Sequence, residues 1–98
     1  MKLLFEQTWD RTISHQDRTL IEQIFEYCNK DVCYTHIRTA MNHKNEQLVT
    51  LLVHNTTDYT ITFQERFVRF GDLEGIFTIP KLTIPPYTSM PWTFIFKS

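Results

Sequence analysis

The hydrophobic period of this chain changes near Val32, and this change limits the possible folds more than any other feature of the sequence. Upstream of Val32, apolar residues recur at the spacing of one helix face, at Leu20, Ile21, Ile24, Phe25 and Cys28. Downstream, apolar and polar residues alternate with the two-residue period of a β-strand. The change predicts one helix followed by at least five antiparallel strands in two sheets, which is a mainly β fold.

The predicted helix has a recognisable start and end. Ser14 suits an N-cap position, and Asp17 follows it as in a capping box with aspartate in place of glutamate. Asn29 suits the left-handed residue that follows a helix. The helix should therefore run over about residues 15–28, and we expect its apolar stripe to cover a sheet face or one open end of a sandwich.

Short alternating segments separated by turn residues predict the strands of a small sandwich. Pro80 should place the fifth strand at an edge or a bulge, and Gly71 and Gly75 should bracket a loop that uses positive φ angles. The expected strands are 34–42, 48–55, 59–63, 65–70, 76–82 and 92–96, with a further short strand at 2–7. The expected core comprises Val49, Leu51, Val53, Ile61, Phe63, Phe94 and either Trp92 or Phe96.

Charge and hydropathy argue against two classes of partner. Ten basic and eleven acidic residues form no cluster of one sign, so we expect no nucleic-acid binding. No run approaches the about 20 apolar residues of a membrane span, and the apolar start ends at Glu6, short of a signal peptide. The expectation is a protein that stays inside the cell.

No group of residues indicates catalysis or a cofactor. Cys28 and Cys33 lack the further ligands of a zinc site, so we expect reduced thiols without metal. His54, at the end of a strand, is the best candidate for a histidine with a tuned pKa, although a strand-end histidine without a role is commoner. We predict no catalytic residue, no metal ligand and no cofactor.

One strand edge is the best candidate for a partner-binding surface. The segment 34–42 has no proline and only Arg38 as an internal charge, so another chain could add a strand to it there. The added strand would come from a second copy, giving a homodimer, or from a client protein. The alternative is that a neighbouring strand or the N-terminal residues already cover this edge. The candidate binding residues are Tyr34, His36 and Arg38, together with Tyr87 in the proline loop.

Three segments together resemble the SLAP domain of Bacillus-type Firmicutes, which is shared with the accessory-Sec S-layer assembly protein. They are Trp9 ahead of Gln16–Arg18, the run Ile37–Lys44 leading into Leu48–Asn55, and the closing Ile84–Phe96 with its Pro-Trp-Thr-Phe ending. The resemblance covers nearly the whole chain. It implies one SLAP-like domain over residues 1–98, a small Ig-like antiparallel β-sandwich over about 32–97 with one N-terminal α-helix.

The resemblance implies a non-enzymatic protein. We therefore expect a protein–protein interaction module that acts as an accessory factor in secretion or assembly of cell-surface proteins. It would be cytoplasmic, either free or peripheral at the inner face of the membrane, with a protein partner whose identity the sequence does not give. The alternative is a small-molecule binder or an enzyme that uses a cleft between helix and sheet. A deep pocket with convergent polar groups would favour this alternative, whereas a flat apolar patch or a free sheet edge would favour the module.

Overall fold

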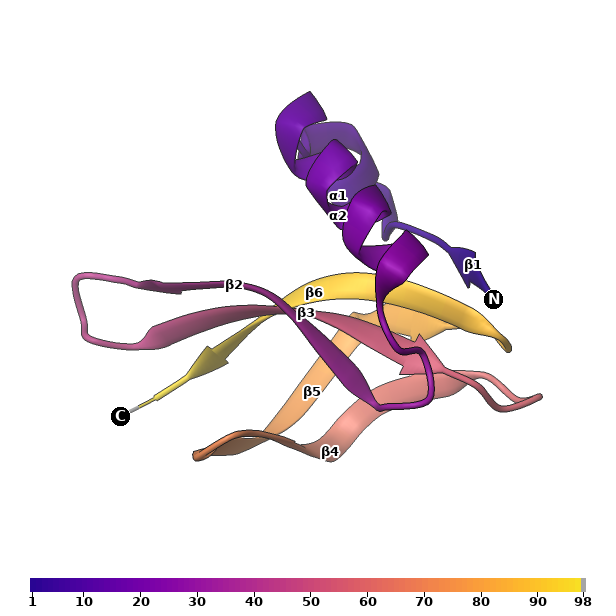
Figure 1. Cartoon of the computed structure of the whole chain (residues 1–98). Coiled ribbons are helices and arrows are strands. Elements are labelled where there is room, and N and C mark those ends of the chain that lie inside the picture. The colour runs from indigo at the N-terminus through magenta and orange to yellow at the C-terminus, as the bar shows by residue number, and fades with distance from the viewer. Residues whose placement is uncertain (98) are drawn as a thin grey trace.

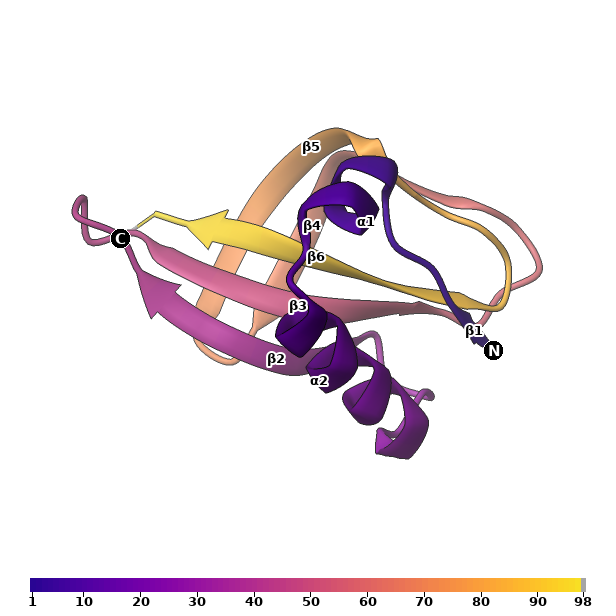
Figure 2. The same ribbon diagram turned by 90° about the horizontal axis from the view of Figure 1, so that it is seen from above.

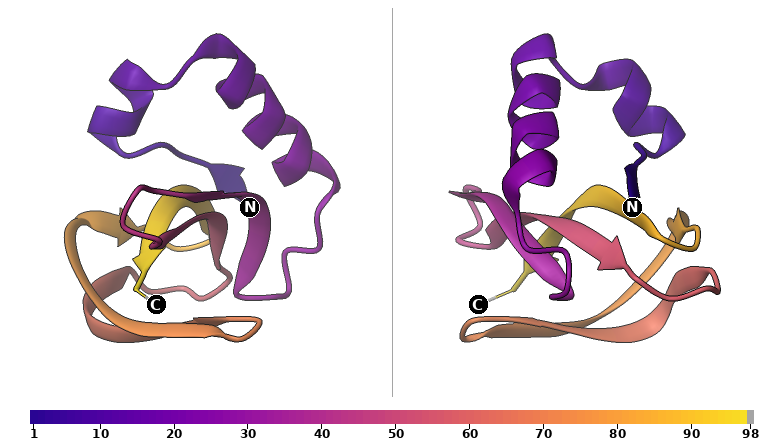
Figure 3. Two further views of the ribbon diagram at one scale, coloured as in Figure 1. Left: turned by 90° about the vertical axis from the view of Figure 1, so that its left-hand side faces the viewer. Right: turned by 45° about the vertical axis from the view of Figure 1, so that its right-hand side comes forward.

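The computed structural model describes residues 1–97 and arranges them in three layers (Figure 1). Two helices lie above one face of a four-stranded sheet, and a two-stranded sheet covers the other face (Figures 1 and 3). The elements in chain order are β1 (Lys2–Leu3), α1 (Gln7–Thr12), α2 (His15–Tyr27), β2 (Tyr34–Met41), β3 (Gln47–Asn55), β4 (Ile61–Phe70), β5 (Leu73–Ile84) and β6 (Thr88–Phe96). The predicted mainly β, sandwich-like fold is confirmed.

The four-stranded sheet has the order β1-β6-β3-β2, and β4 pairs with β5 in the second sheet. All pairings are antiparallel except that of β1 with β6, which is parallel and covers only Thr88 and Ser89 of β6. β3 lies between two partners, as expected for a strand that is apolar on both faces. The expected five antiparallel strands are β2–β6. The short β1 adds a parallel pairing, because the chain crosses above the sheet through both helices before it returns to β2.

The core lies between the two sheets. Its buried side chains are Val49, Leu51, Val53, Phe63, Val68, Leu82, Ile84, Met90, Phe94 and Phe96. Five of the expected core residues and Phe96 are among them. Ile61 and Trp92 are only half-buried, because each lies near an end or an edge of its sheet.

The two strands expected at 59–63 and 65–70 form one strand, β4. A β-bulge lies at the expected break between the two strands. Phe63 pairs with Ile79 and Arg66 with Phe77, so between these two pairs β4 has one residue more than β5. Glu65, within this bulge, has a φ of 49°. Tyr59, expected as the first residue of a strand, lies before β4 and is exposed. On β5, Pro80 lies in a second irregularity of the ladder, as predicted.

Two other local predictions are corrected. Gly71 has the expected positive φ, but Gly75 lies within β5 without one, so it does not close a loop. The last strand begins at Thr88 and continues through Pro91. Pro91 is tolerated because Ser89 bonds outward to Leu4, so by alternation the Pro91 nitrogen also faces away from β3, beyond the end of β1.

Helix α2 has the predicted cap, with the Ser14 side chain accepting from the Asp17 N–H, and its C-cap is Cys28. Its apolar stripe covers the sheet less completely than expected. Ile21 is the buried residue of the helix at 2% exposure, whereas Leu20 is 38% exposed. Seen from above, α2 lies over the β2 side of the sheet and α1 over the β6 side (Figure 2). No helix within residues 1–97 is long and apolar enough to cross a membrane.

Candidate functional site

β2, the strand expected to offer a free edge, is the last strand of its sheet. Within residues 1–97 it pairs with β3 alone, and the N-terminal residues pair with β6 instead. A bulge at Ile37 interrupts its ladder between His36 and Arg38. The bulge alters which way the side chains of this edge point.

Upstream of the bulge, the candidate side chains face the second sheet. Tyr34 meets the core ring of Phe94 edge-on, and burial raises the pKa of its hydroxyl. The His36 ring stacks on Phe70 of β4, with ring centroids 5.4 Å apart. The first contact packs β2 against β6 and the second packs β2 against β4, while His36 itself remains exposed.

Downstream of the bulge, Arg38 turns towards the helices. Its guanidinium donates to Asp17 on α2 at 2.6 Å. This hydrogen bond lowers the pKa of Asp17 and raises that of Arg38. Because both side chains are solvated, the pair orients α2 on the sheet more than it stabilises the fold.

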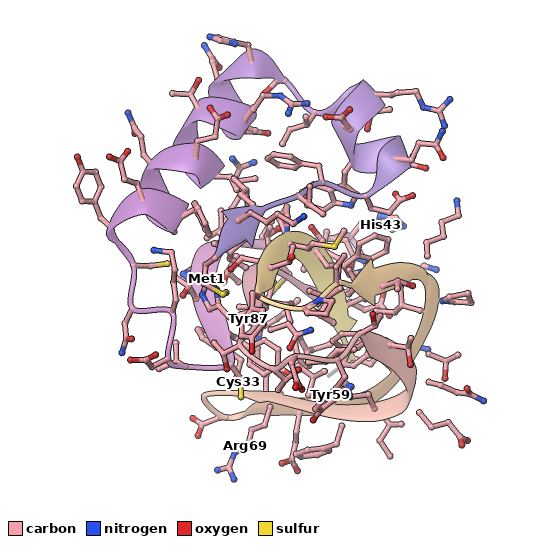
Figure 4. The ribbon with its side chains drawn as sticks, turned by 90° about the vertical axis from the view of Figure 1, so that its right-hand side faces the viewer. Met1, Cys33, His43, Tyr59, Arg69 and Tyr87 are labelled. Carbon is pink, nitrogen blue, oxygen red and sulfur yellow. The ribbon has the colours of Figure 1, made fainter. Side chains whose placement is uncertain are left out.

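Tyr87 lies in the turn before β6, with a positive φ of 53° and an exposed ring. It sits beside Met1 (Figure 4), and its carbonyl accepts from the Lys2 N–H. β3 and β6 separate this turn from β2 in the sheet order. The predicted binding residues therefore do not form one surface, and their binding role stays a prediction.

The structure offers a second free edge, which the sequence did not indicate. A groove of about 520 Å3 lies between β5 and the C-terminal half of β6, and we call it the β5–β6 groove. Ile76 and Ile95 on its walls are 71% and 48% exposed. Its lining is Glu74, Gly75, Ile76, Phe77, Ile79, Trp92, Thr93, Phe94, Ile95, Phe96 and Lys97.

The β6 edge of this groove has unpaired backbone groups. β1 pairs only with Thr88 and Ser89, and the Ser89 carbonyl accepts from the Leu4 N–H. Because alternate residues of a strand direct their peptide groups to the same edge, Thr93 and Ile95 also direct theirs away from β3. No strand within residues 1–97 covers these groups.

Gly75 lines the β5–β6 groove on the β5 side. A Cβ atom built on Gly75 would lie 3.0 Å from the Phe77 ring and 3.8 Å from the Phe96 ring. The glycine therefore lets the Phe77 ring pack directly against the strand, where a side chain would collide with it. Glycine inside a strand often marks a place where a ligand or another backbone approaches closely.

A buried polar cluster surrounds His54 on the face of the four-stranded sheet that the helices cover. The two ring nitrogens of His54 lie 2.6 Å from the Ser89 hydroxyl and 2.7 Å from that of Thr35, and Nε2 is 3.8 Å from the Cys28 sulfur. Burial, followed by the positive charge of Lys30, lowers the pKa of His54. His54 is therefore neutral at pH 7, and each ring nitrogen already has a hydroxyl partner.

This cluster could be mistaken for a catalytic site, because a thiol, an imidazole and a hydroxyl come together in it. Ser89 is fully buried, and none of the cavities described in this section is lined by His54 or Cys28. The arrangement satisfies the polar groups where α2, β2, β3 and β6 meet. Sequence reasoning singled out His54 but missed Ser89 and Thr35, which lie 35 and 19 residues away from it.

Two cavities lie beneath the helices. The one between helix and sheet measures about 170 Å3, and its charged residues Asp17 and Arg38 are paired with each other. The other, about 520 Å3, lies between residues 3–5 and the helices, and its Arg18 is bonded to Asp10 at 2.8 Å. In both, most of the charged groups are already neutralised by a neighbour.

The cysteines lie outside these cavities. Cys28 is half-buried, Cys33 is exposed, and both are free thiols. Within residues 1–97, no group of three histidine, cysteine or acidic side chains is placed to hold a metal ion.

A family model described as SLAP domain matches residues 3–98 of the chain. No curated protein and no solved structure matches it.

Proposed function

The chain belongs to the SLAP domain family, and we propose that it is a non-enzymatic module that binds another protein through the β5–β6 groove. The label of the family refers to accessory Sec, which supports a role in the secretion or assembly of cell-surface proteins. We place this role in the cytoplasm, with the protein free or at the inner face of the membrane.

The observation that carries the proposal is the combination of an apolar groove and a free strand edge. Phe77, Ile79 and Trp92 line the groove and are only partly buried. Exposed apolar surface beside unpaired backbone groups is typical of a site that another polypeptide covers. The groove therefore supports protein binding more than any other surface of the described residues.

The alternative, a small molecule in the cleft between helix and sheet, has less support. That cleft is smaller than the roughly 300–1,000 Å3 of most ligand pockets, and its ion pair leaves few polar groups free to orient a ligand. We also propose β2 as a second place for strand pairing, where two copies could join. Sedimentation of the protein over a range of concentrations tests this homodimer.

Photocrosslinking in cells tests the proposed function. A photoreactive amino acid replaces Ile76 in the groove and, as a control, Tyr27, which is 83% exposed on α2. We expect adducts from position 76 that contain exported proteins, and none of these from position 27. Equal adducts from both positions, or none from position 76, would contradict the proposal.

A further inference from the structure

We infer that the β5–β6 groove binds an extended segment of its protein partner as an additional strand on β6, with alternate apolar side chains inserted between the two sheets. The inference rests on the proposed function and specifies the chemistry of the partner. The occupant is an uncharged, alternating apolar segment that is not folded when it binds. Such a segment is available in a protein that has not yet folded.

The edge of β6 limits where the segment can pair. Towards the N-terminal end of β6, Pro91 lacks an N–H, and Trp92 is covered by Trp9 of α1, with ring centroids 6.1 Å apart. Thr93 and Ile95 are the residues beyond this point that direct both N–H and C=O outward. The segment therefore pairs along about residues 93–97, with a backbone hydrogen-bonding pattern that needs no particular side chain.

The groove decides which side chains the segment carries. Residues of an added strand that lie opposite Phe94 and Phe96 point to the same side as these rings, into the layer between the sheets. There they enter the groove beside the rings of Phe77 and Phe96. A groove of about 520 Å3 can take about two or three large apolar side chains, at every second residue of the segment.

The charges of the groove exclude a charged segment. Between Gly75 and Ile79 on one wall, and between Trp92 and Phe96 on the other, the lining contains no ionisable side chain. A charge inserted there would lose its hydration without a partner. Glu74 and Lys97 carry opposite charges at the mouth, and neither forms an ion pair with another residue in the range 1–97. The net charge of these two residues is therefore zero, and charged residues of the segment fit only where it leaves the groove.

A second folded copy does not supply these side chains through its own β6. The inward-facing Phe94 and Phe96 are 1% and 3% exposed, because they are part of their own core. A second β6 could complete the backbone pairing but would leave the groove empty. A segment with free side chains satisfies both features.

Peptide binding, measured by fluorescence anisotropy, tests the inference. The probe is a capped, labelled peptide of about seven residues in which valine alternates with threonine. A matched peptide has aspartate in place of the central valine. We expect saturable binding of the first and at least about tenfold weaker binding of the second. Absence of binding at millimolar concentration, or equal binding of both, overturns the inference.

Methylation of the peptide nitrogens tests strand pairing directly. One probe is methylated on the threonine nitrogens and another on the valine nitrogens. In an added strand only one of these sets faces β6: the threonines in antiparallel pairing, the valines in parallel pairing. We expect one modified peptide to lose binding at least about tenfold and the other to retain it. An equal effect of both modifications contradicts strand addition.

Protein variants test the location. Gly75→Val adds a side chain to the groove lining and displaces the Phe77 ring. Ile95→Pro removes an outward N–H from β6. Each should weaken binding at least about tenfold. Ile95→Thr also changes the groove lining but keeps the N–H, so it should weaken binding less than Ile95→Pro does. Circular dichroism and a thermal melt establish that each variant is folded. Unchanged binding to folded Gly75→Val and Ile95→Pro overturns the inference.

The outcomes separate this inference from the proposed function. Specific adducts from position 76 in cells, without peptide binding, leave the interaction module standing and contradict strand addition. A concentration-dependent dimer that Ile95→Pro disrupts identifies a second copy as the occupant, and this also contradicts the inference.

Discussion

Asn55 joins the two sheets at one end of the molecule. Its side chain is fully buried, and its amide nitrogen donates to the carbonyls of Tyr59, Ile84 and Pro85. Its oxygen accepts from Thr57. One side chain therefore joins the turn between β3 and β4 to the connection between β5 and β6.

Replacement of Asn55 should destabilise the fold strongly. Asn55→Ala leaves several carbonyls near the core without a donor, and we expect it to lower the free energy of unfolding by about 2–3 kcal/mol. Asn55→Asp keeps the shape and the acceptor but removes the donors, so it should cost at least as much. Urea melts of the three proteins measure the difference. A change below about 0.5 kcal/mol for both variants would show that solvent replaces these bonds.

His54 should make stability depend on pH. Burial and Lys30 lower its pKa in the folded protein, so the folded state takes up a proton less readily than the unfolded chain. The contribution of His54 is fully present above the unfolded pKa of about 6.5 and is lost as the pH falls from there to the folded-state pKa. The urea midpoint should therefore decrease between pH 7.5 and 5.5. In His54→Gln this part of the decrease should be absent; an equal decrease in both proteins would assign it to other groups.

At the scale of elements, α2 is attached to the sheet by a narrow contact. Ile21 is its buried apolar residue, Leu20 next to it is only partly buried, and Arg38 holds Asp17 in the first turn of the helix. A cavity of about 170 Å3 lies beside Ile21. The helix therefore depends on one side chain more than its five-residue apolar stripe indicates.

Two alanine substitutions compare these neighbours. Ile21→Ala should lower the free energy of unfolding by about 2–3 kcal/mol, because the helix would lose its buried contact. Leu20→Ala should lower it less, by about 1 kcal/mol, because the Leu20 side chain is only partly buried. Both variants introduce alanine, which favours a helix, so helix propensity does not explain a difference between their free energies of unfolding. Equal effects in urea melts would mean that α2 is seated differently on the sheet.

At the scale of the whole molecule, stability should be distributed unevenly across the layers. β3 is paired on both sides, and its central residues Leu51 and Leu52 are fully buried. α1 has no buried residue and contacts the sheet through Trp9. The helical layer can therefore open without the loss of the core between the two sheets.

Hydrogen exchange should show that stability differs between the layers. Amides of β3 should exchange most slowly, at rates set by global unfolding, and amides of α1 should exchange fastest among the helices and strands. The outward amides of Thr93 and Ile95 should exchange faster than those of Trp92 and Phe94 on the same strand. Uniform protection along β6 would show that its outer edge is covered, in contradiction to a free edge.

Features that depend on local sequence could be predicted. Ser14 and Asp17 cap α2 through bonds made within one turn, and the apolar stripe determines which side of the helix faces the sheet. The alternation of Val49, Leu51 and Val53, with apolar residues also at the positions between them, identified the central strand. These signals are read from neighbours in the chain, so they do not depend on the rest of the fold.

Features that depend on contacts between residues far apart in the chain could not be predicted from the sequence. α1 is six residues long without a buried face, and a helix that short is stable only through contacts such as that of Trp9 with Trp92. The bulge that merges two expected strands into β4 needs the ladder of β5 beside it. The sequence by itself determined a mainly β chain with one amphipathic helix, because hydrophobic period and capping act locally. Only the tertiary structure decided which edge remains open, because this depends on where β1 ends along β6, and β1 and β6 lie at opposite ends of the chain.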